Sequence, residues 1–266
     1  MKSSGFYVES LLEEPMVVSS ESFLGMEKYK TIIDLKHWYI CNNPDNSYLN
    51  SWRLAKKIKK IAEEGNYDII HTTTNCKTIF FLMPYLWRRK RTIRTVHDPI
   101  PHQEPSLFED FFRNYLNFKA HKHLLFLSHS LLVPFIKRYH YKEENIHFSW
   151  LSVYDYLRSY PIEENMYGRY VLFFGGIKPY KGVDVLIDAY YTSSLPRKGI
   201  KLLIAGKGNI QHVIDKDDHH IILKNRYIDN SELANLIRHS DFVVLPYLSA
   251  TQSGCVMSAY ALDKPI

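Results

Sequence analysis

Short runs of apolar residues recur along the chain, and polar or glycine-containing segments separate them. Short runs that are apolar without alternation are typical of strands buried on both faces of a parallel sheet. The pattern therefore predicts two series of strands. The first comprises Asp68–Thr73, Thr92–His97, His123–Ser128 and Ile146–Trp150, and the second Tyr170–Phe174, Ile200–Ala205, His220–Lys224 and Asp241–Pro246.

Segments with apolar residues at helical spacing lie between these runs. Arg53–Glu64 places its apolar residues on one face and its lysines on the other. Asp229-Asn230-Ser231-Glu232 reads as a capping box before a helix over Leu233–His239. Further helices are expected at Asn75–Arg88, Glu109–His121, Leu131–Tyr139 and Gly182–Tyr191. Strands that alternate with helices predict an α/β fold with parallel sheets and right-handed crossovers.

The organisation of the chain is that of two domains. Its 266 residues exceed one domain of about 150 residues. Asp155–Gly168 has no clear period and is rich in acidic residues, so we place a boundary there and expect domains at 1–160 and 161–266. Residues 1–30 supply no clean apolar strand, and Glu27–Tyr39 fits a helix or a strand. The chain stops at Ile266, where another strand should begin, so we expect a C-terminally truncated chain or a fragment.

The loop after Tyr170–Phe174 carries the clearest chemistry. It reads Gly175-Gly176-Ile177-Lys178-Pro179-Tyr180-Lys181-Gly182 and leads into a helix. Paired glycines let a ligand approach the backbone closely, and a helix N-terminus attracts phosphate. Neither a Walker loop nor a GxGxxG fingerprint is present. The loop fits a phosphate site, and a plain tight turn is the alternative.

Two more loops reach the same edge of the second sheet. Gly206-Lys207-Gly208 ends one strand, and Pro246–Gly254 follows another with small and hydroxylated residues. Ligands of open parallel sheets bind at the carboxyl ends of the strands. Three such loops predict a composite nucleotide site, although the last also fits a serine-rich helix cap.

Composition and cysteine use narrow the setting. Hydrophobic residues make up 45% and charged residues 23%, which excludes disordered and fibrous chains. The three cysteines are far apart with no CxxC pair, which favours a reduced, cytoplasmic setting over a disulfide framework. Met1–Glu9 does not resemble a signal peptide. The longest apolar stretch, Leu124–Ile136, is too short to span a bilayer.

The net charge of +6 is concentrated in one segment. Residues 51–100 contain 11 Lys and Arg against 4 Asp and Glu. Within them, Trp87-Arg88-Arg89-Lys90-Arg91 joins a helix to a strand. We expect residues 85–94 to contact an anionic membrane surface or a lipid-pyrophosphate acceptor, with a solvated loop as the alternative. No nucleic-acid-binding motif is present, so nucleic acid is not an expected partner.

Thirteen histidines raise the question of a metal. His121 and His123 are two residues apart, and His219 and His220 are adjacent. No third ligand has a convincing spacing. The sequence therefore predicts neither a metal nor a cofactor.

A family resemblance joins these motifs. Residues 170–266 resemble the nucleotide-sugar-binding half of glycosyltransferases of family four, which have the GT-B fold. Asp68–His71 and Thr95–Asp98 look like acceptor-domain landmarks of the same family. In the second half the resemblance rests on 172–182, 202–208, 225–228, 240–247 and 259–265. The resemblance implies two doubly wound parallel-sheet domains that face a crevice, the second incomplete.

The activity that the resemblance implies is a retaining, metal-independent transfer of a sugar. The donor would be a nucleotide-sugar and the acceptor a glycan or lipid-linked molecule, as in surface-polysaccharide synthesis. The enzyme would work in the cytoplasm, peripheral to the inner face of the membrane. The alternative is a non-catalytic or truncated family member that binds nucleotide or a partner subunit.

The family's motif residues are matched only in part. Lys181 matches the lysine that grips the donor phosphates, but Gly176 stands at the arginine position. Ala250 and Ser258 stand where the family has two glutamates. Some family members likewise carry Ala-Thr-Gln-Ser-Gly instead of the acidic motif, and that loop would have to replace the carboxylates.

The resemblance and the loops together give a set of candidate site residues. His97 and Asp98 are the candidate catalytic pair, which would orient acceptor or donor hydroxyls; Asp98 before Pro99 also fits an ordinary turn. The candidate donor-binding residues are Gly175, Gly176, Lys181, Gly206, Gly208, Tyr227, Ile228, Thr251, Gln252, Ser253, Gly254 and Ser258.

Overall fold

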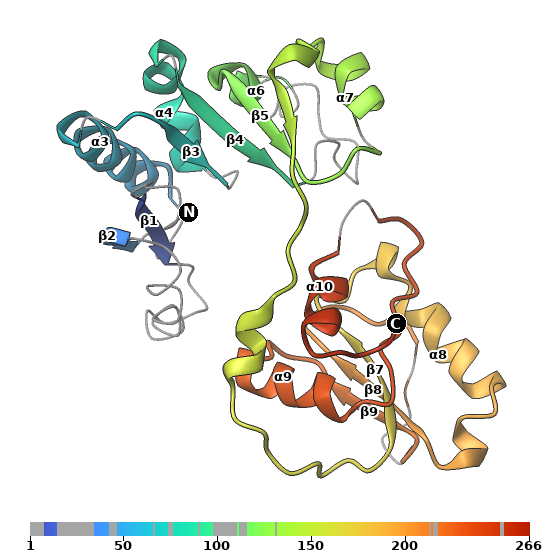
Figure 1. Cartoon of the computed structure of the whole chain (residues 1–266). Coiled ribbons are helices and arrows are strands. Elements are labelled where there is room, and N and C mark those ends of the chain that lie inside the picture. Colours follow the sequence, from blue (N-terminus) through green and yellow to red (C-terminus); the bar gives the residue numbers. More distant parts are fainter. Residues whose placement is uncertain are drawn as a thin grey trace. The chain divides into compact units, whose positions relative to one another are not determined.

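The computed structural model divides the chain into two compact units, residues 1–149 and 150–266 (Figure 1). It describes residues 8–14, 35–42, 47–65, 67–73, 77–89, 91–97, 111, 116–130, 132–212, 214, 218–250 and 253–266, the first two ranges by backbone alone. Asp98, Thr251 and Gln252 of the candidate site lie outside the described residues.

The first unit contains a four-stranded parallel sheet in sequential order. Its strands are β3 (Ile70–Thr72), β4 (Thr92–Val96), β5 (His123–Phe126) and β6 (Ile146–Phe148). The described residues of this unit also form α3 (Tyr48–Glu64), α4 (Lys77–Arg88), α6 (Leu116–Ala120), α7 (Leu132–Tyr139) and the 3₁₀ turn η3 (Glu143–Asn145). The described part of the helix expected at 109–121 is α6.

A separate two-stranded parallel sheet precedes these elements. It pairs β1 (Val8–Glu14) with β2 (Leu35–Asn42). The sequence analysis found no clean strand in residues 1–30, so β1 is a correction; its sequence contains three glutamates and a serine and lacks the continuous apolar run that we used as the criterion.

Alternate residues of β5 explain how the first sheet packs. Leu124 and Phe126 are buried in one cluster with Phe135 and Tyr139 of α7. The ring centroids of Phe126 and Phe135 lie 4.9 Å apart in an edge-to-face arrangement, which aromatic pairs favour. A second cluster joins α3 to α4. These clusters position the carboxyl ends of the strands.

The second unit is built on β7 (Tyr170–Phe174), β8 (Lys201–Ala205) and β9 (Ile221–Lys224), all parallel. A fourth segment lies on the other side of β7, where Val244 N donates to Leu172 O at 2.8 Å. Val243 N in turn donates to Pro265 O at 2.9 Å. The sheet therefore extends in both directions from β7, so a topological switch point lies between β7 and residues 241–244.

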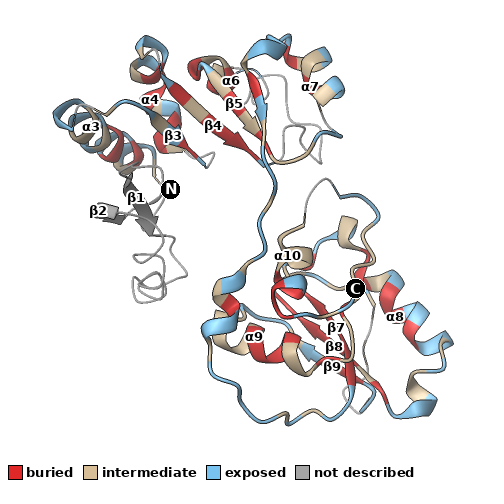
Figure 2. Cartoon of the chain, viewed as in Figure 1, coloured by how far each residue is buried: buried red, intermediate tan, exposed pale blue. Residues whose placement is uncertain are grey.

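Both faces of this sheet are covered, as the continuous apolar runs predict (Figure 2). Every residue of β7 is buried. Leu172 and Phe174 pack with α9 (Asn230–His239) and α10 (Gly254–Ala261), whereas Val171 and Phe173 pack with α8 (Val183–Thr192). Three 3₁₀ turns complete the unit: η4 (Asp155–Ser159), η5 (Pro179–Lys181) and η6 (Pro196–Lys198).

Residues 150–160, which the sequence analysis assigned to the first domain, belong to the second unit. Leu157 of η4 is fully buried in the cluster that contains Tyr170 and Leu172. Tyr154 and Tyr160 pack against the same cluster. The division at 149 therefore precedes the expected one because these side chains complete the core beside α9 and α10.

Candidate functional site

Most of the described candidate donor residues lie in loops at the carboxyl edge of the sheet in the second unit. Gly175 directly follows β7, Gly206 follows β8, and Asn225 follows β9. Pro246 lies just beyond the segment that pairs with β7. The three glycine- and serine-containing loops of the sequence analysis thus begin at one edge of one sheet, next to its switch point.

Gly206 and Gly208 bring two of these loops into main-chain contact. A Cβ on Gly206 would overlap the carbonyl oxygen of Gly175, and one on Gly208 would overlap that of Ile177. Ile177 N also donates to Lys207 O at 2.9 Å. Glycine is needed here because backbone meets backbone. These two residues fix the loop after β7, which is a positioning role.

Gly176 lies differently within the same loop. It is exposed, and the nearest atom to a Cβ built on it is Lys207 O at 4.0 Å. Its peptide group is thus accessible at the switch point, and the space beside it is open.

Lys181 supplies positive charge at this loop. Its Nζ lies 5.0 Å from the centroid of the Tyr247 ring, within range of a cation–π interaction. A Cβ on Gly175, at φ +109°, would lie 3.1 Å from Lys181 Nζ and 3.0 Å from Cys255 Sγ. The ammonium and the thiol therefore both border the first residue after β7.

Tyr247 and Cys255 join the last loop to this group. Ser253 Oγ donates to the Tyr247 hydroxyl at 3.3 Å, and Cys255 Sγ donates to Phe174 O at 3.4 Å. Burial raises the pKa of Tyr247, and the neighbouring Cys255 raises it further. Tyr247 is therefore a neutral ring under Lys181. Neither residue was predicted from the sequence, because the contacts of Tyr247 with Lys181 and of Cys255 with Phe174 span 66 and 81 positions of the chain. The position of Tyr247 directly after Pro246 in the motif 240–247 was the available signal.

The loop after β9 contributes Tyr227 and Ile228. Tyr227 is half exposed, and Ile228 packs against the core. Beside them, Asn225 accepts from Gly208 N at 3.0 Å and donates to Gly208 O at 2.9 Å. This side-chain amide, which the sequence analysis quoted but did not select, joins the loops after β8 and β9.

The residues of α10 differ in what they offer a ligand. Ser253 precedes the helix and is partly exposed. Gly254 contacts Tyr154, whose hydroxyl would lie 3.0 Å from a Cβ there. Ser258 is buried, and its hydroxyl donates to Gly254 O at 3.0 Å within the helix. A donor contact from the Ser258 hydroxyl would therefore require that bond to break.

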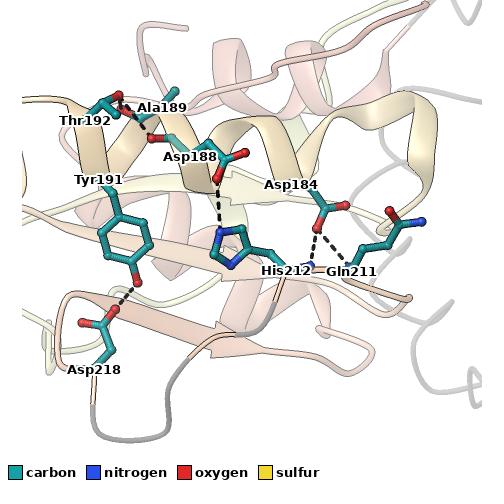
Figure 3. A network of polar contacts seen from close by, with 8 residues as sticks. All are labelled: Asp184, Asp188, Ala189, Tyr191, Thr192, Gln211, His212 and Asp218. Carbon is teal, nitrogen blue, oxygen red and sulfur yellow. Dashed lines mark hydrogen bonds and ion pairs between the residues drawn. The ribbon is translucent and has the colours of Figure 1, made fainter.

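Polar side chains of α8 fix the chain beyond Gly208 (Figure 3). Asp184 Oδ1 accepts from Gln211 N at 3.0 Å and from His212 N at 2.8 Å. His212 Nε2 bonds to Asp188 Oδ1 at 3.1 Å, and the Tyr191 hydroxyl donates to Asp218. The segment after β8 is thus anchored on α8, the helix that follows the glycine-containing loop at 175–182.

His97 is the described member of the candidate catalytic pair. It directly follows β4 in the first unit and is exposed. It therefore lies at the carboxyl edge of its sheet, as the sequence analysis expects, and its imidazole is accessible.

A buried polar group lies behind this edge. His121 Nδ1 donates to Asn117 O at 2.9 Å, so its Nε2 accepts from the Thr72 hydroxyl at 2.9 Å. Burial lowers the pKa of His121 to about 4; the Asn117 bond opposes this shift, and the charges of Arg94 and His71 add to it. His121 is therefore neutral near pH 7 and ties β3 to α6.

Neither a metal-binding cluster nor a bilayer-spanning helix occurs among the described residues. The described residues contain no group of three or more His, Cys, Asp or Glu side chains arranged to hold a metal ion. Among the described helices, none combines the length and apolar character that crossing a bilayer requires.

Two family profiles match the chain. Residues 168–266 match the profile described as glycosyl transferases group 1, and residues 15–148 match that described as glycosyltransferase family 4. The second match alone covers half of the chain. The chain belongs to glycosyltransferase family 4.

Curated relatives of this family 4 chain include two mannosyltransferases of Xanthomonas campestris pv. campestris. Both are described as GDP-mannose:glycolipid 4-beta-D-mannosyltransferase, at 24% identity over 182 residues and 25% over 186 residues. The matches cover 65% of this chain and 48% of each relative. The chain thus spans about half the length of these relatives.

Solved structures of similar fold cover nearly the whole family 4 chain. HepE of Anabaena in complex with UDP has a TM-score of 0.62 at 15% identity, over 97% of this chain and 79% of that one. WaaG, a glycosyltransferase involved in lipopolysaccharide biosynthesis, has a TM-score of 0.59 at 13% identity, over 98% and 80%. The fold is GT-B, as the sequence analysis expects.

Proposed function

We propose that this family 4 protein transfers a sugar from a nucleotide-sugar donor to a glycan or lipid-linked acceptor, with retention, in surface-polysaccharide synthesis. The observation that carries the proposal is the group at the switch point of the second sheet: the Lys181 ammonium on the Tyr247 ring, beside the open backbone at Gly176. The activity for which the Xanthomonas relatives are named supports a glycolipid acceptor, and the UDP complex of HepE supports a nucleotide donor.

The proposed chemistry follows from this arrangement. The bond between the anomeric carbon and the donor phosphate breaks, and the acceptor oxygen bonds to that carbon on the same face. The hydroxyl proton leaves with the nucleoside diphosphate. Lys181 and the loop amides stabilise the charge that develops on the departing diphosphate. Ser253 and Gly254, with Thr251 and Gln252, bind phosphate or sugar hydroxyls, and Tyr227 and Ile228 contact the nucleoside.

The remaining partners and the setting are also proposed. His97 and Asp98 orient the acceptor hydroxyl from the first unit. The transfer needs no metal and no cofactor. The enzyme acts in the cytoplasm, peripheral to the inner face of the membrane, with residues 85–94 toward anionic lipid, and it takes no nucleic acid as a partner.

One reaction tests the function. The chain, incubated with UDP- or GDP-sugars and a lipid-linked glycan in the presence of EDTA, is expected to release the nucleoside diphosphate and form a glycoside of unchanged anomeric configuration. Diphosphate release is measured by chromatography and configuration by NMR. A product of inverted anomeric configuration would contradict the proposed retention. Loss of activity in EDTA would contradict the proposed metal independence.

A separate measurement tests Lys181. Lys181→Ala is expected to weaken binding of UDP or GDP by about 1–2 kcal/mol, the scale of one charge-assisted hydrogen bond. Titration calorimetry compares it with Lys198→Ala, which removes the same charge from η6, away from the candidate site. An affinity that changes equally in both variants, or in neither, contradicts the assignment of Lys181.

A second candidate function is a non-catalytic family member that binds nucleotide or a partner subunit. The Ser258 hydroxyl bonded inside α10 favours it, as does the lack of a side chain at Gly176. This alternative would hold if the protein binds nucleoside diphosphate in a way that depends on Lys181 but releases no nucleoside diphosphate from any nucleotide-sugar.

A further inference from the structure

A cavity of about 270 Å³ lies at the amino edge of the sheet in the first unit. It is lined by Tyr67, Asp68, Ile70, Arg88, Arg89 and Arg91. Ile70 begins β3, where its N donates to Arg91 O at 3.1 Å, and Arg88 ends α4. His97 follows the opposite end of β4, six residues after Arg91, which is about 20 Å at 3.3 Å per residue. The cavity is therefore separate from the candidate catalytic edge.

The lining side chains carry an excess of positive charge. Three are guanidinium groups and one is a carboxylate. Arg91 Nη1 lies 3.7 Å from Asp68 Oδ1, but both side chains are largely exposed, so water weakens this pair. In the described part of the chain, no carboxylate lies within ion-pair distance of Arg88 or Arg89. The C-terminus of α4 adds only about half a negative charge.

Arg89 is also held in place. Its Nη2 donates to the Tyr85 hydroxyl at 2.7 Å, and its guanidinium carbon lies 4.8 Å from the centroid of the Tyr85 ring. A guanidinium oriented in this way loses less conformational freedom when it binds a ligand. Guanidinium groups bind phosphate oxygens through two parallel hydrogen bonds, which a solvated ammonium does not match.

We propose that this cavity is a phosphate-binding site, separate from the donor and acceptor edges; its lipid-bound form rests on the proposed contact of residues 85–94 with anionic lipid. Its ligand is a phosphate group, carried either by an anionic phospholipid headgroup or by a soluble phosphate compound. Ile69 and Trp87 flank the lining residues in sequence and are exposed by 49% and 54%. Such apolar side chains would meet a lipid but would add nothing to the binding of a soluble phosphate.

The first test uses inorganic pyrophosphate and titration calorimetry at low salt. A variant with Arg88→Gln, Arg89→Gln and Arg91→Gln is expected to bind about tenfold more weakly than the wild type. The control carries Lys57→Gln, Lys59→Gln and Lys60→Gln, which remove the same charge from exposed positions of α3 in the same unit. The control is expected to bind as the wild type does. Circular dichroism verifies that both variants are folded.

The second test identifies the source of the phosphate. Vesicles of phosphatidylcholine with phosphatidylglycerol are compared with vesicles of phosphatidylcholine alone, for the same three proteins. A headgroup ligand predicts binding only to the anionic vesicles, loss in the arginine variant, and a tryptophan emission shift that Trp87→Phe abolishes. A soluble ligand predicts pyrophosphate binding without vesicle binding. The proposal is overturned if neither probe binds, or if the arginine and lysine variants lose binding equally.

Discussion

Gly182→Ala is expected to lower the free energy of unfolding by about 3 kcal/mol, whereas Gly199→Ala is expected to cost about 1 kcal/mol. Both glycines have φ +68°, so an alanine suffers the same backbone strain at either position. They differ in space: a Cβ on Gly182 would overlap Pro246 O, and one on Gly199 would have no atom within 4 Å. The difference between the unfolding free energies of the two variants therefore measures the close contact of Gly182, in the loop after β7, with Pro246, which follows residues 241–244.

Urea unfolding followed by circular dichroism gives the two stabilities. Binding of UDP or GDP is the second measurement. Gly182→Ala is expected to lose this binding at protein concentrations at which Gly199→Ala still binds the nucleotide. Equal destabilisation by the two substitutions would contradict the close approach of Gly182 to Pro246.

Acidification from pH 6.5 to 4 is expected to remove about 3 kcal/mol of stability through His121. Burial lowers the folded-state pKa of His121 to about 4, against the ordinary value of 6.5. In this window the unfolded chain binds the proton and the folded chain does not. The stabilisation is therefore complete above pH 6.5 and is lost as the pH falls to 4. Burial also lowers the pKa of His71, which acts in the same direction.

The measurement is the urea midpoint as a function of pH for the wild type, His121→Gln and His97→Gln. The His121 variant is expected to have the flattest profile between pH 6.5 and 4. His97→Gln is the matched control, because it replaces an exposed imidazole at the end of β4. Identical slopes for all three proteins would contradict a buried, neutral His121.

Most of the sheet structure was predictable because strands buried on both faces must be apolar throughout. The run Tyr170–Phe174 predicted β7 to the residue. The apolar run Asp241–Pro246 predicted a strand of six residues. The structure shows a shorter pairing with β7, which consists of one bridge between Leu172 and Val243 and its hydrogen bonds. The strand β1 was missed because its polar residues break the apolar pattern. The division at residue 149 was missed because the burial of Leu157 depends on helices more than 70 residues away.

The candidate site was predictable only at the level of loops. Strand–loop–helix order places Gly175, Gly206 and the loop after Pro246 at one edge without any coordinates. The contact of Lys181 with Tyr247 was not predictable, because it depends on side-chain directions in segments 66 residues apart. The inward bond of the Ser258 hydroxyl was equally hidden, since a serine at that position fits either a ligand or its own helix.

The main-chain contacts at Gly206 and Gly208 have a consequence for how this protein can change. They hold Gly175 and Ile177, the residues on either side of Gly176, through contacts between main chains. The residue at 176 therefore takes no part in holding the loop, and the space beside it is open. Charge at this edge of the sheet can thus be gained or lost by one substitution while the fold stays intact, so under the proposed function evolution can tune the affinity for the donor independently of stability.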